Sequence, residues 1–419
     1  MAELIKVGEL CDISSSKRIF AKEYQKSGIP FFRGKEVTEK YNGKLDVTTE
    51  LFISEEKYSE LESKFGVPNK GDMLLTSVGT LGSTYIVKES DKFYFKDGNL
   101  TWFKNFRNLN SHYLQYWLES PEGKAQLRKS EIGSSQSAYT IANLKEMQIS
   151  LPLIDEQLSV VRYIKRYDNL IANNNRRIAI LEDMAQSLYR EWFVSFRYPN
   201  YQDNLDADGK PKLIDSPLGQ IPDGWEVKKI KDLGVVNTGK TPSKAKQEYY
   251  SSADVPFLKT PDMHGAIFSV DIGDYLSLEG ANSQKNKFVP ANSVCVSCIG
   301  ARAGVVTITS EKLQTNQQIN SVVLNDTKYR EYFYLFAVSL HQKIHALGSS
   351  GATMTNVNKS KFEGIEVIVP PEEVIQGFSS KTAFSFDLIL NLQKRNKNLK
   401  KQRDMLLPKL ISGQIELKD

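Results

Sequence analysis

The chain repeats itself, and this duplication constrains its fold more than any other feature, because both copies must form the same kind of structure. Pro152 ends a strand-like segment at residues 148–152, and Pro370 ends a matching segment at residues 366–370. The two prolines lie 218 positions apart, and the same offset continues without a gap to the end of the sequence. The sequence therefore predicts two equivalent modules in tandem.

Short strand patterns also recur upstream of each proline. Residues 29–33 and 255–259 each form a strand pattern that ends in a basic residue. Residues 71–79 and 291–300 each begin a β-hairpin pattern with glycine at the turn.

Polar loops and helical segments complete the repeat. A Gly-Ser-Ser loop begins at Gly133 and a second begins at Gly348; Thr140 follows the first, and we match it to Thr355 after the second. Helical patterns at residues 111–119 and 328–341 accompany the short strands, so each module is predicted to be α+β.

A long helix is predicted after each proline. In the first copy, eight seam residues alternate in steps of four and three, which is the heptad pattern of a coiled coil. The positions 218 residues later form the same seam with more polar members. At a rise of 1.5 Å per residue, a helix of roughly 40 residues spans about 60 Å. The first seam consists of Tyr167, Ile171, Asn174, Ile178, Leu181, Ala185, Leu188 and Trp192, and the second of Ser385, Ile389, Leu392, Asn396, Leu399, Arg403, Leu406 and Leu410.

The composition limits the class of protein. The chain has 419 residues, of which 40% are hydrophobic and 25% are charged, as in globular proteins. It contains no apolar stretch of membrane-spanning length and no signal-peptide core, so we expect a cytoplasmic protein that does not bind a membrane. Three cysteines are too few for a disulfide framework. A net charge of +5 does not indicate a nucleic-acid binder, so that function must be argued from local pattern.

Four short strings, in this order along the chain, resemble the specificity subunit of type I restriction-modification enzymes. One opens the central helix at residues 151–157 and another lies near its end at residues 188–193. Residues 221–225, Ile-Pro-Asp-Gly-Trp, lead into the second module, and residues 406–413 close the distal helix. The resemblance covers essentially the whole chain. Two departures are that the second helix lacks the Glu-Gln pair of the first, and that the first module lacks a Pro-Asp-Gly-Trp lead-in.

The resemblance implies an α+β fold with two mixed α/β target-recognition domains in tandem, separated by two long antiparallel coiled-coil helices with an internal pseudo-two-fold repeat. The expected divisions are a first target-recognition domain at 1–152, a central helix at 153–197, an irregular linker at 198–222, a second target-recognition domain at 223–370 and a distal helix at 371–419.

The resemblance also implies a non-catalytic subunit that reads a bipartite target in double-stranded DNA, with one half-site for each domain. Its helices would carry two methyltransferase (M) subunits and, through the complex, the restriction or translocase (R) subunits. The chain itself would bind no cofactor, whereas the partner subunits would use S-adenosylmethionine, ATP and Mg²⁺.

A pseudo-two-fold axis between antiparallel helices pairs positions whose residue numbers have a constant sum. The helix midpoints near residues 176 and 394 give 570, and so do Asn174 and Asn396, the only asparagines in the two seams. We therefore predict that these amides face each other within about 6 Å or through a bridging water, and that they set the register. The alternative is that one or both lie beside water where the seam is splayed.

Base edges are read by Arg, Lys, Asn, Gln, Ser and Thr, while phosphate contacts fix orientation. Both modules carry small polar residues with a basic neighbour at the same places in the repeat, and the Gly-Ser-Ser loops form the leading pair. For each residue, the alternative is an ordinary solvated loop. The candidates in the first module are Arg33, Lys35, Thr76, Ser77, Thr80, Ser134, Ser135, Gln136 and Tyr139, and those in the second are Lys240, Lys244, Lys259, Thr260, Arg302, Gln317, Gln318, Ser349, Ser350 and Thr353.

Residues 234–241 match the P-loop pattern and suggest an alternative class, an NTP-binding protein. A P-loop follows a buried strand and opens a helix, whereas residues 226–232 are highly charged and residues 242–244 begin no clear helix. We therefore favour DNA recognition. Two more classes stay open, namely the specificity subunit of a related two-part restriction system and an interaction scaffold that does not bind DNA.

The remaining motifs point to structure more than to chemistry. Cys295 and Cys298 supply only half a zinc site, so packing within a strand is favoured. His341 and His345 lie one helical turn apart without the carboxylate of a zinc protease. The chain lacks the cofactor and base-binding strings of an adenine methyltransferase. The basic run at residues 394–403 is interpreted as a solvated helix face, with partner docking as the alternative.

Overall fold

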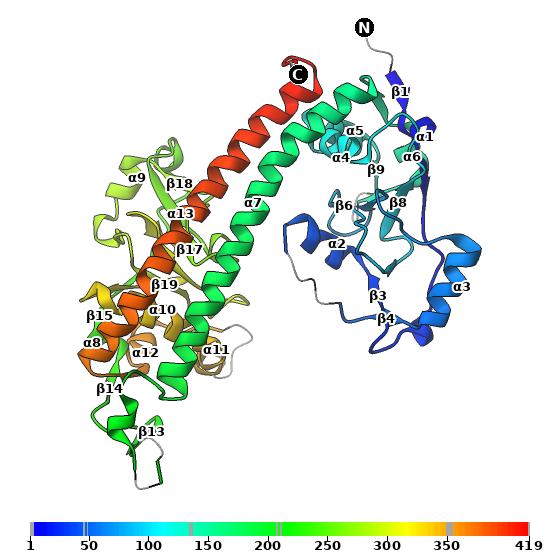
Figure 1. Cartoon of the computed structure of the whole chain (residues 1–419). Helices are drawn as coiled ribbons and strands as arrows, with labels where there is room; N and C mark the ends of the chain where they lie inside the picture. Colours follow the sequence, from blue (N-terminus) through cyan, green and yellow to red (C-terminus); the bar gives the residue numbers. More distant parts are fainter. Residues whose placement is uncertain are drawn as a thin grey trace. The chain divides into compact units, whose positions relative to one another are not determined.

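The computed structural model describes residues 4–44, 47, 49–133, 137–206, 208–209, 212–348 and 355–417. The chain packs into two units (Figure 1). Unit 1 consists of Met1–Ala172 with Leu399–Asp419, and unit 2 consists of Asn173–Asn398. Each unit therefore contains one module together with part of each long helix.

Unit 1 is built on two small sheets and two strand pairs, β1-β11 and β9-β10. The four-stranded antiparallel sheet has the order β2-β8-β5-β6, and the three-stranded sheet has the order β4-β3-β7, in which β3 is antiparallel to β4 and parallel to β7. The pair β1-β11 brings the two ends of the module together. The strands are β1 (Leu4–Lys6), β2 (Asp12–Ser14), β3 (Ile29–Phe32), β4 (Phe52–Ile53), β5 (Met73–Thr76), β6 (Thr84–Ile86), β7 (Tyr94–Phe95), β8 (Leu100–Lys104), β9 (Glu131–Ile132), β10 (Ala138–Tyr139) and β11 (Gln148–Ser150).

Unit 2 repeats this plan. Its five-stranded sheet has the order β15-β22-β19-β20-β17, and its three-stranded sheet has the order β18-β16-β21, with β16 parallel to β21 as β3 is to β7. The pair β14-β23 corresponds to β1-β11. The strands are β12 (Leu213–Ser216), β13 (Gly219–Pro222), β14 (Glu226–Lys229), β15 (Gly234–Thr238), β16 (Val255–Leu258), β17 (Phe268–Ser269), β18 (Tyr275–Leu276), β19 (Val294–Ser297), β20 (Val306–Thr309), β21 (Gln314–Thr315), β22 (Ile319–Leu324) and β23 (Glu366–Val369).

Short helices cover the sheets. Those of unit 1 are α1 (Val7–Leu10), η1 (Ala21–Glu23), α2 (Gly34–Tyr41), α3 (Glu55–Phe65), α4 (Ser111–Glu119), α5 (Pro121–Lys129) and α6 (Ile141–Glu146). Those of unit 2 are η3 (Tyr201–Asn204), α8 (Ile230–Leu233), η4 (Gln247–Tyr250), η5 (Thr260–Met263), α9 (Leu278–Asn282), η6 (Lys285–Lys287), η7 (Thr327–Tyr329), α10 (Arg330–Ser339), α11 (His341–Gly348) and α12 (Lys359–Glu363).

Local chemistry explains several element boundaries. The Asn110 side chain accepts hydrogen bonds from the first turn of α4, and Thr140 does the same for α6. The hairpins β5-β6 and β19-β20 turn through Gly79 and Gly300, whose φ angles of 83° and 95° suit glycine. The two hairpins predicted from the sequence are thus confirmed.

The repeat is in register over a longer stretch than the sequence indicated. Asn358 caps α12 through Lys361 N as Thr140 caps α6 through Asn143 N, and these two caps lie 218 positions apart. Thr355 is therefore not the counterpart of Thr140, and that match was wrong by three residues. The error arose because the loop that follows Gly348 is longer than the loop that follows Gly133.

The two long helices are α7 (Ile154–Tyr189), which continues as the π-helix η2 (Arg190–Val194), and α13 (Glu372–Ile411). Figure 1 shows α7 in green and α13 in orange to red. Within unit 2 they run antiparallel, because Asn174 hydrogen-bonds to Asn396 while Trp192 packs against Gly377. Within unit 1, Asp168 pairs with Arg403 in the same sense.

The expected contact between the two asparagines is present. Asn174 Nδ2 donates to Asn396 Oδ1 over 2.8 Å, and Asn396 Nδ2 donates to Asn175 Oδ1 over 2.8 Å. Asn174 and Asn396 are both buried. Whether the pair sets the register stays a prediction.

The inner face of α13 differs at one expected position. Ser385 is only half-buried, whereas its neighbour Phe386 is fully buried beside Ile389. Phe386 packs against Phe268 and Tyr334 of the module, so the start of α13 faces the module core as well as α7. The uninterrupted heptad assignment was therefore wrong here.

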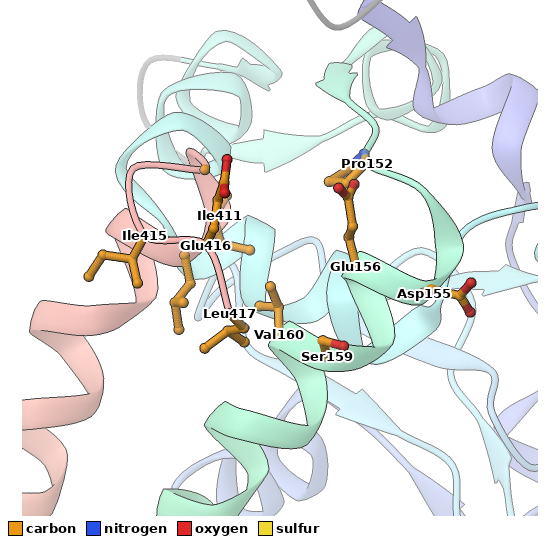
Figure 2. A pocket seen from close by; sticks show the side chains of 11 residues that line it. Pro152, Asp155, Glu156, Ser159, Val160, Ile411, Ile415, Glu416 and Leu417 are labelled. Carbon is orange, nitrogen blue, oxygen red and sulfur yellow. The ribbon is translucent and has the colours of Figure 1, made fainter. Parts of the chain in front are cut away.

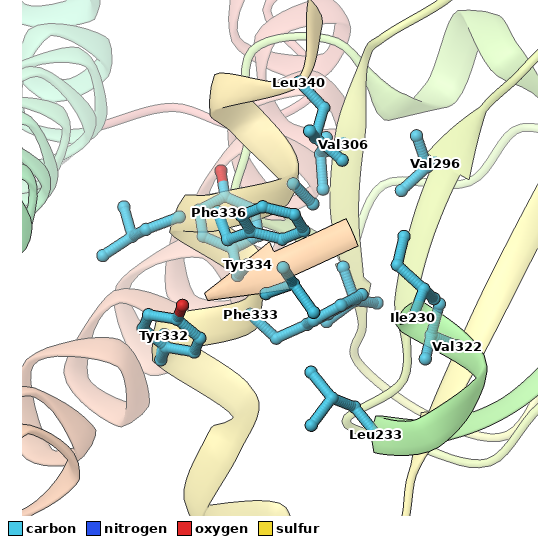
Figure 3. Packing of buried hydrophobic residues seen from close by; sticks show 14 of the residues in the cluster. Ile230, Leu233, Val296, Val306, Val322, Tyr332, Phe333, Tyr334, Phe336 and Leu340 are labelled. Carbon is cyan, nitrogen blue, oxygen red and sulfur yellow. The ribbon is translucent and has the colours of Figure 1, made fainter. Parts of the chain in front are cut away.

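Each core combines a module with both long helices. In unit 1, Val160, Val161 and Ile164 of α7 and Leu407 and Leu410 of α13 join the module core. In unit 2, the later part of α7 and the early part of α13 do so. Figure 3 shows this second core, in which Phe333 and Phe336 of α10, and Leu340 directly after it, face strand residues such as Val306.

The predicted class is confirmed: two mixed α/β modules and two long antiparallel helices form an internal repeat. The segment expected to be an irregular linker contains the β12-β13 hairpin, which the many turn residues concealed. Among the described residues, no helix has the length and apolar character needed to cross a membrane.

Candidate nucleic-acid interface

Three backbone segments meet at one end of the unit 1 sheets. The Ser77 amide donates to Asn99 O over 2.8 Å, and the Tyr139 amide donates to Ser77 O over 3.0 Å. The turn after β5, the loop after β7 and strand β10 are thereby held side by side.

Three of the candidates in this group are buried. Thr76 Oγ1 accepts a hydrogen bond from Ser83 N over 2.8 Å, and Ser77 Oγ lies 2.6 Å from Thr101 Oγ1. Tyr139 is also buried, beside Gly82. Thr80, at the tip of the turn, is exposed. In this arrangement Thr76, Ser77 and Tyr139 support the turn, and Thr80 is the side chain that it presents.

Arg33 is engaged by carboxylates. Its guanidinium lies 2.9 Å from the buried Glu36 and 3.3 Å from Glu50, and Lys35 lies 3.2 Å from Glu50. Hydrogen bonding and charge from Glu36, opposed by partial burial, raise the pKa of Arg33. Arg33 therefore has a structural role, because it neutralises a buried carboxylate.

Unit 2 assembles the same segments with the same hydrogen bonds. The Cys298 amide donates to Gln318 O over 2.7 Å, and the Val357 amide donates to Cys298 O over 2.9 Å. These bonds correspond to those of Ser77 and Tyr139 in unit 1. The Gly300 amide donates to Thr355 O over 2.9 Å, so the described flank of the second Gly-Ser-Ser loop lies at the hairpin turn.

Side chains in this second cluster divide into buried and exposed groups. Buried Thr260 donates to Gln318 Oε1 over 3.2 Å, and Lys259 pairs with Asp274 over 2.7 Å. Gln317 is exposed and accepts a hydrogen bond from Thr241 over 2.6 Å. Arg302 is exposed on the turn and, among the described residues, has no ion-pair partner.

The histidine near this turn is less basic than a free imidazole. Partial desolvation, with a smaller contribution from Arg302, lowers the pKa of the exposed His264 and favours its neutral form. Lys240 and Lys244 are exposed on the neighbouring loop. The exposed candidates of unit 2 thus include three basic residues, whereas those of unit 1 are Thr80 and Lys35, and Lys35 is paired with Glu50.

Six candidates, which belong to the two Gly-Ser-Ser loops, lie outside the described residues: Ser134, Ser135, Gln136, Ser349, Ser350 and Thr353.

The repeat exposes a candidate loop that the sequence reasoning missed. The Lys96 amide donates to Phe32 O over 2.8 Å, as the Asn316 amide donates to Leu258 O over 3.2 Å. The loop Lys96–Asn99 is therefore the counterpart of the loop that contains Gln317 and Gln318. Alignment of the two parallel strands β7 and β21 is the signal that would have found it.

The P-loop match does not form a phosphate cradle. Residues 234–238 form strand β15, and no α-helix follows before α9 in the described chain. A Cβ at Gly239 would lie 2.2 Å from Asn316 O, and the Lys240 amide donates to Thr315 O over 2.9 Å. The backbone of this loop is thus packed and hydrogen-bonded against β21 and Asn316, so it does not surround a phosphate-sized space.

The cysteines and histidines lack metal-site geometry. Cys295 and Cys298 are buried in and after β19, and burial raises the pKa of both thiols to about 12. His345 Nδ1 lies 3.1 Å from Thr355 Oγ1. In the described part of the chain, no group of three or more His, Cys, Asp or Glu could hold a metal ion.

Comparison with known proteins defines the class. The family model described as Type I restriction modification DNA specificity domain matches residues 2–183 and 222–401. The chain therefore belongs to this family.

Individual relatives agree with this assignment. The HindI type I restriction enzyme specificity subunit of Haemophilus influenzae is 32% identical over 66% of this chain and 71% of that protein. The MjaIX specificity subunit of Methanocaldococcus jannaschii is 28% identical over 84% and 79%. A crystal structure of a type I restriction-modification S subunit from M. genitalium shares the fold, with a TM-score of 0.59 at 15% identity over 98% of this chain and 96% of that one. This chain is the non-catalytic DNA specificity subunit of a type I restriction-modification system.

Proposed function

We propose that each module reads one half of a bipartite target in double-stranded DNA. The observation that carries the proposal is the repeated cluster of loops, in which the Ser77–Asn99 and Cys298–Gln318 hydrogen bonds are equivalent. Two copies of one reading surface suit two half-sites, because protein symmetry and target symmetry match in dimeric DNA-binding proteins.

Exposure separates the roles within each surface. Thr80 and Lys35 in unit 1, and Arg302 and Gln317 in unit 2, are the accessible polar candidates for contact with bases. Lys240 and Lys244 are suited to phosphates. The buried candidates would act by holding the turns in place.

The long helices would carry two methyltransferase (M) subunits and, through them, the restriction or translocase (R) subunits. S-adenosylmethionine, ATP and Mg²⁺ would be used by those partners, and the complex would act in the cytoplasm. These proposals about partners and cofactors are supported by the family to which the chain belongs.

The test is to co-express the chain with its methyltransferase partner and to map methylated adenines across a genome. We expect a split motif with a constant gap. Exchanging residues 1–152 for those of a relative should alter only one half-site, and exchanging residues 223–370 should alter only the other. A single exchange that altered both half-sites would contradict the modular proposal.

A filter-binding assay with a salt titration distinguishes DNA recognition from the alternative role of a scaffold that does not bind DNA. A specific DNA binder should lose affinity steeply as salt rises. Absence of DNA binding by the chain in complex with its methyltransferase partner would favour a scaffold.

A further inference from the structure

Unit 1 contains a pocket at the start of α7 and the end of α13. It has a volume of about 340 Å³ and is lined by residues of the first turns of α7 and by the segment that follows α13. Figure 2 shows Val160 and Ser159 on one side and Ile415, Glu416 and Leu417 on the other.

Unit 2 has an equivalent backbone hydrogen bond at the corresponding place. The Ile415 amide donates to Lys409 O over 3.1 Å, and the Arg197 amide donates to Glu191 O over 2.8 Å. Both residues of each pair are shifted by the repeat offset of 218, so the two helices close with the same hydrogen bond. The side chains around this hydrogen bond can therefore be compared, although the last turn of α7 is a π-helix and that of α13 is an α-helix.

In unit 2, aromatic side chains fill this place. The counterparts of Leu410, Ile411 and Val160 are Trp192, Phe193 and Phe378, which are buried against one another. The lead-in residue Trp225 then packs on this group, with its ring 6.0 Å from that of Phe193 and 5.4 Å from that of Tyr198. Tyr198 is the counterpart of the pocket residue Glu416. Among the described residues of unit 1, the side chains at this place are smaller and no tryptophan lines the pocket.

The surface beside the pocket is also apolar only in unit 1. Leu153, Ile154 and Leu158 are exposed, Leu153 to 75%. Their counterparts at the start of α13 are Pro371, Glu372 and Gln376. Exposed apolar side chains grouped next to a pocket are typical of a binding surface.

The charge of the lining is negative. Asp155, Glu156 and Glu416 line the pocket, and no lysine or arginine of the described chain does. Carboxylates in a first helical turn also stabilise the helix, which explains Asp155 and Glu156. Glu416 lies beyond the helix and has no such role. In unit 2, the first-turn residue Glu372 is paired with Lys328.

We propose that this pocket binds a segment of a partner protein, anchored by an aromatic side chain and flanked by basic residues. The aromatic anchor would occupy the place that Trp225 and its neighbours fill in unit 2. The basic flanks would face Asp155, Glu156 and Glu416. Buried aromatic residues dominate many binding hot spots, and complementary charges around them favour the correct partner.

The test uses a dye-labelled peptide with the sequence of residues 219–229 that carries Asp223→Lys and Glu226→Lys, together with the full chain. Fluorescence anisotropy should show saturable binding. Ser159→Trp, which places an indole in the pocket, should weaken binding at least about tenfold. Glu416→Lys, at an exposed position that leaves the core intact, should weaken it about fivefold.

Matched controls show which results would contradict the proposal. Glu62→Lys makes the same charge change on α3, away from the pocket, and should leave binding unchanged. A peptide that also carries Trp225→Ala should bind at least about tenfold more weakly. The proposal is wrong if the Trp225→Ala peptide binds equally well, if Ser159→Trp and Glu416→Lys both bind as the wild type does, or if no saturation occurs below about 1 mM. A dimer of the chain that Ser159→Trp dissociates would make a second copy the occupant instead.

Discussion

The two units use different chemistry at the same place in the repeat. In unit 1, Arg403 of α13 lies 2.8 Å from Asp168 of α7, and the Tyr116 hydroxyl donates to the same carboxylate over 2.5 Å. The positions equivalent to Asp168 and Arg403 in unit 2 are Phe386 and Ala185, and both are buried. One helix pairing thus accommodates either an ion pair or an apolar contact. The backbone geometry is set by the repeat, and the side chains have diverged on it.

The largest expected effect comes from breaking the ion pair. Arg403→Ala should lower the free energy of unfolding by about 2–3 kcal/mol, less than the roughly 3–5 kcal/mol of a fully buried pair, because Asp168 keeps some contact with water. Urea unfolding, with hydrogen exchange in α4 as a local readout, measures it.

The matched control for this prediction is the double variant with Asp168→Leu and Arg403→Ala, which imitates unit 2. It should recover most of the lost stability, since no charge is left without a partner. If the single and double variants were equally unstable, the packing of the arginine stem would outweigh its charge.

Titration offers a second comparison. Burial raises the pKa of Glu119 in unit 1 to about 7, against a smaller opposing influence of Arg403, and burial alone raises that of Glu182 in unit 2 to about 7. The unfolded chain releases these protons near pH 4.5, so the folded state binds more protons between pH 4.5 and 7 and its stability falls as the pH rises through that range.

Each of the variants Glu119→Gln and Glu182→Gln should remove part of this pH dependence. The stability that a variant gains over the wild type should be larger at pH 8 than at pH 5 by about 2 kcal/mol. Thermal unfolding at both pH values checks it. A wild type whose stability is constant over this range would show that both carboxyls keep ordinary pKa values.

Loss of an arginine from each proposed reading surface should affect the stability of the fold differently in the two units. Arg302→Ala should weaken binding by about 1–3 kcal/mol at one base position and leave the unfolding free energy unchanged, because this exposed side chain has no ion-pair partner among the described residues. Arg33→Ala should also destabilise unit 1, because it leaves Glu36 buried without its cation.

DNA binding to targets substituted at single positions, together with urea unfolding, separates these outcomes. Equal stability of the two variants would show that Arg33 does not support the fold. Lys244→Ala serves as the control, since loss of a phosphate contact should weaken all targets alike.

The smallest effect is expected at the contact between two asparagines, one from each long helix. Asn174→Leu should cost about 1 kcal/mol, because it leaves Asn396 Oδ1 buried without its donor. The double variant with Asn396→Leu should regain that stability. If the asparagines set the register, the double variant should also form engineered cysteine cross-links in more than one register.

The duplication and its offset could be predicted from sequence because they follow from linear patterns: prolines, glycine turns and a heptad seam. The Asn174–Asn396 contact follows from the same symmetry. The packing partner of each seam residue could not be predicted, since Phe386 faces its module and Ser385 does not. Short polar segments were equally ambiguous: Thr76, Ser77 and Thr260 have the composition of a DNA-reading loop, yet they are buried in hydrogen bonds within their own turns.

The division of the long helices between the units has a consequence for biosynthesis. Unit 2 is one continuous stretch of chain, Asn173–Asn398, whereas the core of unit 1 needs Leu407 and Leu410. Domains generally fold in the order in which the ribosome delivers them. Here the module that is translated first is completed last, and until then its face for α13 is open to chaperones, proteases and neighbouring chains.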